Sequence, residues 1–443
     1  MHDISIKKSV LTLQVYIDSV WRDMAELYFN KDYELETMEY LTDYVVDFFE
    51  QTNAKAISIN YPVNVFIENA ELLMTTLGDI MPAGASRRYW LEALDIKHLP
   101  LSHQNYLLLK NGAISPIGNL RIKESIPKIQ NERYFSLQVV KNRQSDFLEY
   151  ANQTGAIVGG ATGAGGEAPK LLLKRRDEQV WIDNLQLGLD CDVAYLVKYP
   201  RGNYSDLDCD ILRAEYHYYH ELHTLGFSTI DIELMKLEEG ERYPSLWLPR
   251  FDMKFENGKW KRYAMESVYS MLKKYGGNLD HEQTIRQLLN VISNSQFANH
   301  FDSQRFVIEW VKRDLLNIAF GNSDNHGRNT AFLRDDKQIW LSPIYDFAPM
   351  RADPEGIIRT ATWSRREEPP QELADEYRFD KIADSLADLI EPNALLQELK
   401  MLANQLIDLK SRLSKRGVPI SILDFPAIGF DYLPEKLQRW GLV

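Results

Sequence analysis

Apolar residues recur along the chain with two periods, and their order predicts a strand-rich first part and a helical last part. Alternating β-branched and aromatic residues over 10–17 and 24–29 predict a hairpin. Apolar residues spaced by three and four, as over 306–320, predict amphipathic helices. The further strands that we expect are 56–60, 120–122, 171–173, 193–198, 245–252, 330–333 and 339–341. The helices that we expect are 37–49, 69–80, 87–94, 210–225, 265–274, 281–293, 306–320 and 395–413.

The composition is that of an ordinary globular protein of 443 residues, with 44% hydrophobic and 26% charged residues. Two cysteines are too few for a disulfide framework or a zinc site, so we expect a reducing, cytoplasmic setting. The net charge of −13 argues against direct binding of nucleic acid. We find neither a signal-peptide pattern nor an apolar run of membrane-spanning length, and we expect no membrane contact.

The polar loop 321–329, between a predicted helix and a predicted hairpin, has residue types suited to phosphoryl transfer. A hydroxyl that attacks the terminal phosphate of ATP needs a proton acceptor, and Asp324 can be that carboxylate. Magnesium prefers oxygen ligands, which Asn329 and Asp346 offer. Asp324 and Asn329 are five positions apart, as in the protein-kinase pattern H-R-D-x-x-x-x-N. The alternative is a surface loop, because Asn, Asp, Ser and Gly are also common in turns.

A glycine-rich stretch, 155–166, precedes Lys170 and a short apolar strand. Glycines such as Gly165 and Gly166 let backbone N–H groups approach phosphate oxygens, so the stretch can cover a nucleotide. The Walker A pattern is absent, and a strand rather than a helix follows. The alternative is a flexible linker, although a linker would rarely end in a lysine on an apolar strand.

Further along, Lys198 ends a strand that is similar to the V-A-I-K strand of kinases, where the lysine pairs the inner phosphates of ATP. Glu215 lies early in the next predicted helix, where a kinase keeps the carboxylate that orients this lysine. Its alternative role is to favour the helix dipole.

The order of these motifs resembles the HipA family of bacterial serine/threonine kinases, the toxins of HipBA-like toxin–antitoxin systems. The resemblance extends over nearly the whole chain, since two N-terminal segments also match. The motifs that carry it are Asp79-Ile80-Met81-Pro82-Ala83-Gly84-Ala85, Ile117-Gly118-Asn119-Leu120, Gly165-Gly166-Glu167-Ala168-Pro169-Lys170, Leu196-Val197-Lys198-Tyr199-Pro200, Pro249-Arg250-Phe251-Asp252, Ser323-Asp324-Asn325-His326-Gly327-Arg328-Asn329 and Ser342-Pro343-Ile344-Tyr345-Asp346.

The resemblance implies an α+β, protein-kinase-like fold of two lobes. We expect a HipA-like N-terminal subdomain over 1–135, a strand-rich small lobe over 136–253 and an all-helical C-terminal lobe over 254–443. It also implies an ATP- and Mg²⁺-dependent serine/threonine kinase, a toxin that acts on a translation protein such as an aminoacyl-tRNA synthetase. The implied partner is a small helix-turn-helix antitoxin.

The resemblance assigns roles to individual residues. Asp324 would be the catalytic proton acceptor, and Asn329 and Asp346 would hold magnesium. The residues that would contact ATP are Gly165, Gly166, Lys170, Lys198, Pro249, Arg250, Phe251, His326, Asn329 and Asp346.

Two other functions are compatible with this pattern. One is a small-molecule kinase, because such enzymes use similar Asp–Asn–Asp loops. The other is a non-catalytic binding or regulatory module. The presence of Asp324, Asn329 and Asp346 together argues against the module, since a scaffold needs none of the three.

Self-regulation is a further expectation, because members of the family phosphorylate a serine in the glycine loop. This chain has no serine there; the nearest hydroxyl belongs to Thr162. A phosphate on Thr162 would add about two negative charges beside the triphosphate and disfavour nucleotide binding. We expect mass spectrometry of protein incubated with Mg-ATP to find Thr162 phosphorylated, and active enzyme unmodified at Thr162 would contradict this. The alternative is a small turn residue.

Overall fold

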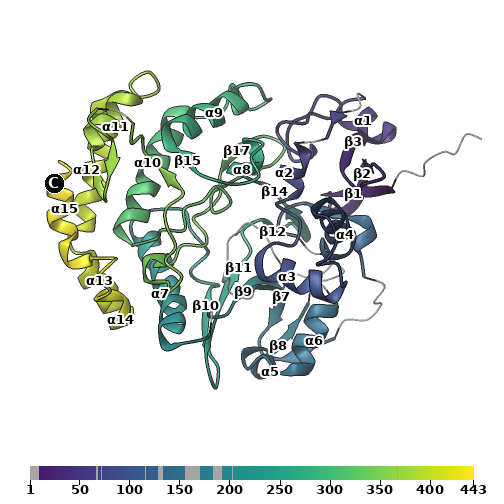
Figure 1. Cartoon of the computed structure of the whole chain (residues 1–443), viewed down its shortest axis with the longest axis horizontal. Helices are drawn as coiled ribbons and strands as arrows, with labels where there is room; N and C mark the ends of the chain where they lie inside the picture. Colours follow the sequence, from purple (N-terminus) through teal and green to yellow (C-terminus); the bar gives the residue numbers. More distant parts are fainter. Residues whose placement is uncertain are drawn as a thin grey trace, which may run out of the picture.

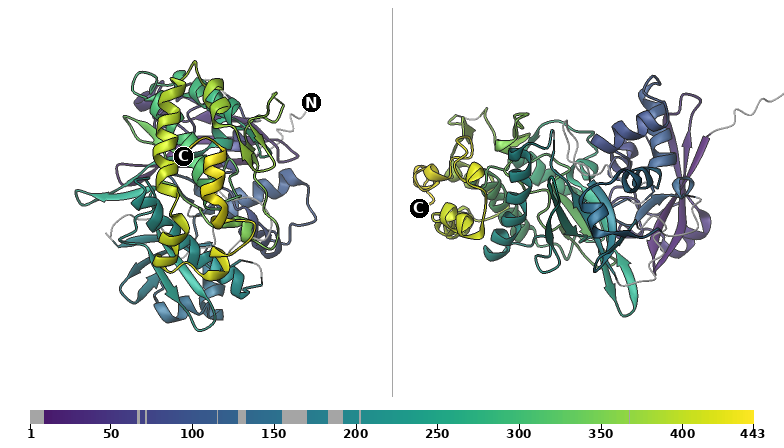
Figure 2. Two further views of the ribbon diagram at one scale, coloured as in Figure 1. Left: turned by 90° about the vertical axis from the view of Figure 1, so that its left-hand side faces the viewer. Right: turned by 90° about the horizontal axis from the view of Figure 1, so that it is seen from below.

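The computed structural model describes residues 9–65, 68–70, 72–114, 116–127, 133–154, 170–182, 192–201, 203–366 and 368–443. In Figure 1 the N-terminal elements (purple and blue) lie on the right and the C-terminal helices (yellow) on the left. Strands from the middle of the chain (teal) lie between them. The view from below in Figure 2 shows the same order. Glycine-loop residues Thr162, Gly165 and Gly166 lie outside the described residues.

The N-terminal part is built on an antiparallel sheet with the strand order β4-β3-β2-β1-β5. Its hairpin was predicted, and the pairing of β1 with β2 confirms it. Leu11, Leu13 and Val15 are fully buried, which explains the alternating pattern. The elements are β1 (Ser9–Ile17), β2 (Val20–Phe29), β3 (Leu35–Tyr40), α1 (Thr42–Phe48), β4 (Glu68–Asn69), α2 (Leu73–Leu77), α3 (Gly84–Ala93), α4 (Leu101–Gly112), β5 (Leu120–Ile122) and η1 (Lys123–Ser125).

Several N-terminal predictions were wrong. The helix expected over 37–49 begins only at Thr42, because residues 35–40 form β3 beside β2. The helix expected over 69–80 is the short α2. Residues 56–60 form only an isolated bridge between Ser58 and Tyr61. In the first case pairing with the neighbouring strand β2 outweighs the local helical spacing.

The middle part is an antiparallel sheet with the strand order β10-β11-β9-β7-β8-β6. Strand β9 matches the predicted 193–198, and it lies between β7 and β11. Helix α7 packs against β11 and also against α13 and α14, so it joins the sheet to the C-terminal helices. The elements are β6 (Phe135–Ser136), α5 (Leu137–Lys141), α6 (Ser145–Gln153), β7 (Lys170–Arg176), β8 (Gln179–Trp181), β9 (Val193–Lys198), α7 (Asp206–Thr224), β10 (Lys236–Glu239) and β11 (Pro244–Pro249).

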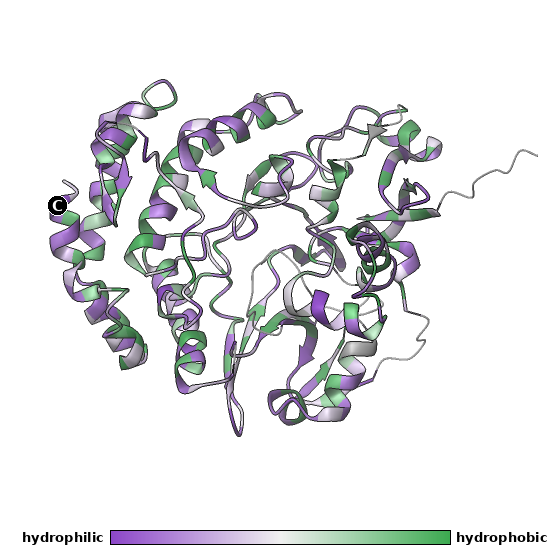
Figure 3. Ribbon diagram, viewed as in Figure 1, coloured by the Kyte–Doolittle hydropathy of each residue, from purple (hydrophilic) through white to green (hydrophobic). Residues whose placement is uncertain are grey.

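The C-terminal part has a core of buried residues from α7, α9, α10, α12 and α13. Its helices carry both purple and green residues in Figure 3, as expected for helices with one buried and one exposed face. The helices are α8 (Val268–Met271), α9 (His281–Ser293), α10 (Ser303–Ala319), η2 (Met350–Ala352), α11 (Phe379–Ser385), α12 (Pro392–Leu406), α13 (Leu409–Arg416), α14 (Ile420–Leu423), η3 (Phe430–Tyr432) and α15 (Leu433–Arg439). The strands are β12 (Met253–Glu256), β13 (Lys259–Arg262), β14 (Ala264–Ser267), β15 (Leu279–Asp280), β16 (Ala331–Arg334), β17 (Ile339–Leu341), β18 (Ala361–Thr362), β19 (Glu372–Leu373) and β20 (Glu376–Tyr377).

The prediction that residues 254–443 are all helical was therefore wrong. The helix expected over 265–274 is strand β14 followed by the short α8, because β14 pairs with β16. The helix expected over 395–413 is divided into α12 and α13. Helix α9 matches the predicted 281–293, and β16 with β17 confirms the predicted hairpin. The boundaries after 135 and 253 stay predictions.

Gly321 lies where α10 passes into the polar loop, and its backbone requires glycine. Its φ is +69°, and a Cβ atom built there would lie 2.8 Å from Ile428 Cγ1. A side chain would therefore add overlap to the strain of a left-handed backbone.

We expect Gly321→Ala to lower the free energy of unfolding by about 3 kcal/mol, measured by urea denaturation. Gly258→Ala is the matched control, because Gly258 has a φ of +75° but no atom within 4 Å of its Cβ position. Gly258→Ala should lower the free energy of unfolding by the backbone strain alone, about 1 kcal/mol. Equal losses in the two variants would contradict the overlap with Ile428.

Candidate active site

A buried ion cluster lies where β9, α7 and the loop after β17 meet. Lys198 Nζ donates to Glu215 Oε1 at 2.5 Å and also to Asp346 Oδ1. Tyr219 Oη donates to the same Glu215 oxygen at 2.8 Å, which holds the carboxylate toward the lysine. Burial lowers the pKa of Lys198, but the charges of Asp346 and Glu215 outweigh it and leave this pKa above its usual value. The lysine is therefore charged.

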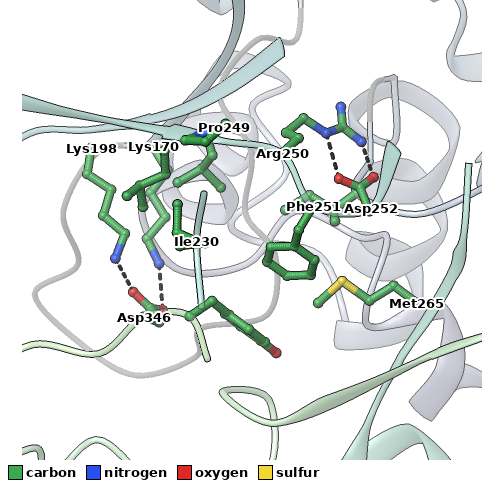
Figure 4. Close-up of a pocket in the computed structure, with 13 residues that line it drawn as sticks. Lys170, Lys198, Ile230, Pro249, Arg250, Phe251, Asp252, Met265 and Asp346 are labelled. Carbon is green, nitrogen blue, oxygen red and sulfur yellow. Dashed lines mark hydrogen bonds and ion pairs between the residues drawn. The ribbon is translucent and has the colours of Figure 1, made fainter. Parts of the chain in front are cut away.

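Asp346 receives a second cation from the start of β7. Lys170 Nζ donates to Asp346 Oδ2 at 3.0 Å, and Figure 4 shows both lysines pointing at this carboxylate. Burial raises the pKa of Asp346, but the charges of Lys170 and Lys198 prevail and hold it well below its usual range. The backbone of Asp346 is left-handed, with a φ of +54°. Packing of the next residue, Phe347, against Tyr218 and Phe320 keeps the turn in place.

Lys170, Lys198 and Asp346 line one end of a cleft whose remaining walls are mostly apolar (Figure 4). The apolar residues of these walls are Ile117, Leu196, Ile230, Leu248, Pro249, Phe251, Met265 and Tyr345. Predicted residues Pro249, Arg250 and Phe251 all line the cleft. The guanidinium of Arg250, however, bonds Asp252, with Nε at 2.9 Å from Oδ1. Arg250 therefore shapes the cleft through an ion pair.

The loop 321–329 is folded back on itself around Asp324. Asn329 Nδ2 donates to the backbone oxygen of Asp324 at 2.7 Å. The backbone N–H of Arg328 donates to His326 Nδ1 at 3.2 Å, so the proton of the neutral ring lies on Nε2, 3.5 Å from Asp324 Oδ1. Asn329 Oδ1 and His326 Nε2 are buried and make no hydrogen bond within the described chain. Both atoms can serve a ligand.

The structure thus divides most of the described site residues that we predicted between two cavities, and Asn329 lines neither of them. Lys170, Lys198 and Asp346 line the cleft of Figure 4, whereas Asp324 and His326 line a second cavity of about 590 Å³. Among the described residues, no group of three or more His, Cys, Asp and Glu is placed to hold a metal ion. In the same part of the chain, no helix combines the length and the apolar character needed to cross a membrane.

The comparisons with known proteins concern the family and the fold of the chain. The family model of the HipA-like C-terminal domain matches residues 162–408. The chain belongs to the HipA family. The chain is similar to HipA from Shewanella oneidensis MR-1, whose structure was solved with HipB and operator DNA. The match covers 97% of this chain and 97% of the Shewanella chain, with a TM-score of 0.67 and 14% identity. That likeness shows the fold.

Another solved structure is the proinflammatory kinase CtkA of Helicobacter pylori, with a TM-score of 0.38 and 14% identity. The match covers 63% of this chain and 89% of the CtkA chain, and the likeness is too weak to support an argument. No curated protein matches the sequence.

In this HipA-family chain the N-terminal part contacts the loop 321–329 directly. Arg328 Nη1 donates to the backbone oxygen of Gly78 at 2.7 Å and lies 3.5 Å from Asp79 Oδ1. The backbone N–H and the hydroxyl of Ser267 both donate to Asp79 at 2.8 Å. Sequence reasoning gave Asp79 and Arg328 no individual role, although both lie within the motifs that carry the family resemblance.

A second group of contacts that sequence reasoning missed also holds the loop. Asn325 Nδ2 donates to the backbone oxygen of Ala361 at 2.7 Å, and its Oδ1 accepts from the N–H of Thr360 at 2.9 Å. Behind it, buried Asp314 pairs with Arg359 at 3.0 Å. Arg359 lies next to Thr360, so this ion pair anchors the segment that Asn325 contacts.

Asp79 also makes stability depend on pH. Burial raises its pKa from 3.8 to about 6, although the charge of Arg328 opposes the rise. Because the folded pKa lies above the unfolded one, the contribution of Asp79 to stability is complete below pH 3.8 and is lost as the pH rises through about 6.

We expect Asp79→Asn to remove this loss. The free energy of unfolding of Asp79→Asn minus that of the wild type should rise by at most about 3 kcal/mol between about pH 4 and about pH 7. Urea denaturation at both pH values measures it, with Asp32→Asn, which removes an exposed carboxylate of the same part, as the control. A difference that does not change with pH would refute the role of Asp79.

Proposed function

We propose that this HipA-family chain is an ATP- and Mg²⁺-dependent serine/threonine protein kinase. The observation that carries the proposal is the buried Lys198–Glu215–Asp346 cluster together with the loop that holds Asp324 and Asn329. Kinases need such a lysine on a strand, a carboxylate on the following helix to orient it, and a separate carboxylate near the acceptor hydroxyl.

The residues present fit a nucleotide and a magnesium ion. Lys170 and Lys198 place two cations at one end of an apolar cleft, which suits phosphates at that end and adenine between the walls. Asn329 Oδ1, buried without a hydrogen-bond partner among the described residues, and the Asp346 carboxylate are hard oxygen ligands of the type that magnesium prefers. ATP would supply the transferable phosphoryl group, and the positive charge of magnesium would offset the negative charge of the phosphate oxygens.

Asp324 takes the role of proton acceptor in this proposal. It lines an open cavity beside the loop, where a substrate hydroxyl can reach it. Asn329 and Asn325 fix the loop through backbone atoms, so the carboxylate is held before the substrate arrives. His326 Nε2 lies 3.5 Å from Asp324 Oδ1 without a hydrogen bond to it, and His326 would contact the phosphates.

The biological setting that we propose follows the family. The Shewanella HipA was solved with HipB and operator DNA, and we propose a similar small helix-turn-helix antitoxin as the partner here. The substrate would be a translation-related protein such as an aminoacyl-tRNA synthetase, phosphorylated in the cytoplasm by a toxin. A small-molecule kinase is the rival, and the apolar rim of the acceptor cavity, with Ile358 77% exposed, favours a protein surface instead.

We expect Asp324→Ala to abolish phosphoryl transfer while the affinity for Mg-ATP is retained. Losing the proton acceptor should slow transfer by about a thousandfold or more. Lys198→Ala should instead weaken nucleotide binding, because it removes a phosphate contact. Phosphoproteomics after brief expression measures transfer, and calorimetry measures binding.

Asp408→Ala is the matched control, since Asp408 is an exposed carboxylate at the start of α13. It should behave as the wild type in both measurements. Near-normal turnover of Asp324→Ala would overturn the proposal, and unchanged nucleotide affinity in Lys198→Ala would remove that lysine from the site.

A further inference from the structure

The cavity beside Asp324 is formed by segments that are far apart in the sequence. Its walls come from 78–87 of the N-terminal part, from 275–277, from the loop around Asp324 and from 356–360. Its volume of about 590 Å³ lies within the usual range for ligand sites, about 300–1,000 Å³. The N-terminal part therefore supplies a wall of the space in which an acceptor hydroxyl would approach Asp324.

Arg87, on α3, carries the positive charge that the N-terminal part contributes to this wall. It is half-buried, and its guanidinium donates to Asn105 Oδ1 at 2.9 Å and to Gln104 Oε1 at 3.0 Å. Both acceptors are neutral amides, and no carboxylate among the described residues pairs with Arg87. The other arginine of the cavity, Arg328, lies 3.5 Å from Asp79 Oδ1.

The two amides hold the guanidinium in place without neutralising it. Burial lowers the pKa of Arg87, which reflects the cost of keeping the charge partly out of water. A guanidinium has five N–H donors, and two of them are used by the amides. The remaining donors and the uncompensated charge suit a carboxylate or phosphate on the molecule that enters the cavity.

The rim of the cavity indicates what kind of molecule carries this group. Ile358 is 77% exposed and Tyr275 is 62% exposed, and both belong to the cavity lining. Gly276 and Gly277 beside Tyr275 leave the backbone open to contact. Exposed apolar side chains next to accessible backbone suit an extended peptide segment.

We propose that this cavity binds the acceptor segment of a protein substrate and that Arg87 selects an acidic residue close in sequence to the phosphorylated Ser or Thr. The inference rests on the proposed kinase function and adds the substrate class. Arg87 acts here as a specificity-determining residue, because it contacts the substrate away from the reacting hydroxyl.

A positional-scanning library of Ser and Thr peptides with Mg-ATP tests the inference. The quantity to measure is the ratio of kcat/KM for acidic peptides to that for neutral peptides. The wild type should prefer Asp or Glu near the hydroxyl by about tenfold. Arg87→Gln should reduce this ratio to near one, chiefly through KM, while Arg87→Lys should retain part of it. Arg88→Gln, which removes an exposed arginine from the same helix, is the matched control and should keep the wild-type ratio.

The ratio is taken within each variant, so it does not depend on the fraction of folded protein. Arg87→Glu adds a charge reversal, and its preferred peptides should contain Lys or Arg instead. A wild type without acidic preference, or an Arg87→Gln variant that keeps it, overturns the inference and leaves the kinase assignment standing. Transfer to no peptide, with Mg-ATP binding intact, also overturns it. Absence of both transfer and Mg-ATP binding overturns the proposed function as well.

Discussion

The candidate active site depends on the buried contact of Lys198 with Glu215 and Asp346. Removing three charges from water is costly, and the cost is met only because the lysine touches both carboxylates and Tyr219 bonds the first of them. The contact joins β9 of the middle sheet, helix α7 and the loop after β17. It therefore holds the sheet and the C-terminal part together at one end of the cleft. In the proposed enzyme, phosphates would compete with Asp346 for Lys170 and Lys198.

The N-terminal part belongs to the same structural unit as the site. Gly78 and Asp79 hold Arg328 of the polar loop, and the N–H of Gly118 donates at 2.7 Å to Asp252, which lines the cleft. Ser58 Oγ donates to buried Glu266 at 2.5 Å, next to β16. These contacts connect residues far apart in the sequence. The N-terminal segments thus hold the loop 321–329 in position and form one wall of the cavity beside Asp324.

Overall charge and local charge act in opposite directions in this molecule. The chain carries a net charge of −13, which disfavours the approach of acidic partners. Fields between exposed charges are screened over roughly 8 Å at physiological ionic strength. In the proposed enzyme, a half-buried Arg87 would therefore select an acidic group at short range despite the net negative charge, and Asp324 on another wall would accept the hydroxyl proton.

The sequence by itself determined the features that depend on a single segment of the chain. The strand 193–198 and the helix 281–293 matched their predicted bounds, because apolar periodicity records which face of a single segment is buried. The spacing of Asp324 and Asn329 identified the candidate loop. Both residues lie in the same short loop, where Asn329 bonds the backbone oxygen of Asp324, so their relation is visible in the local sequence.

Only the tertiary structure decided the features that depend on a distant partner. The first residues of the helix predicted over 265–274 instead form strand β14, because β16 offers them a ladder of backbone hydrogen bonds. The position of Arg87 in the cavity beside Asp324 depends on how α3 and the loop 321–329 pack together. Hydrophobic patterns record that a face is buried, whereas the partner that buries it is chosen by the packing of the whole chain.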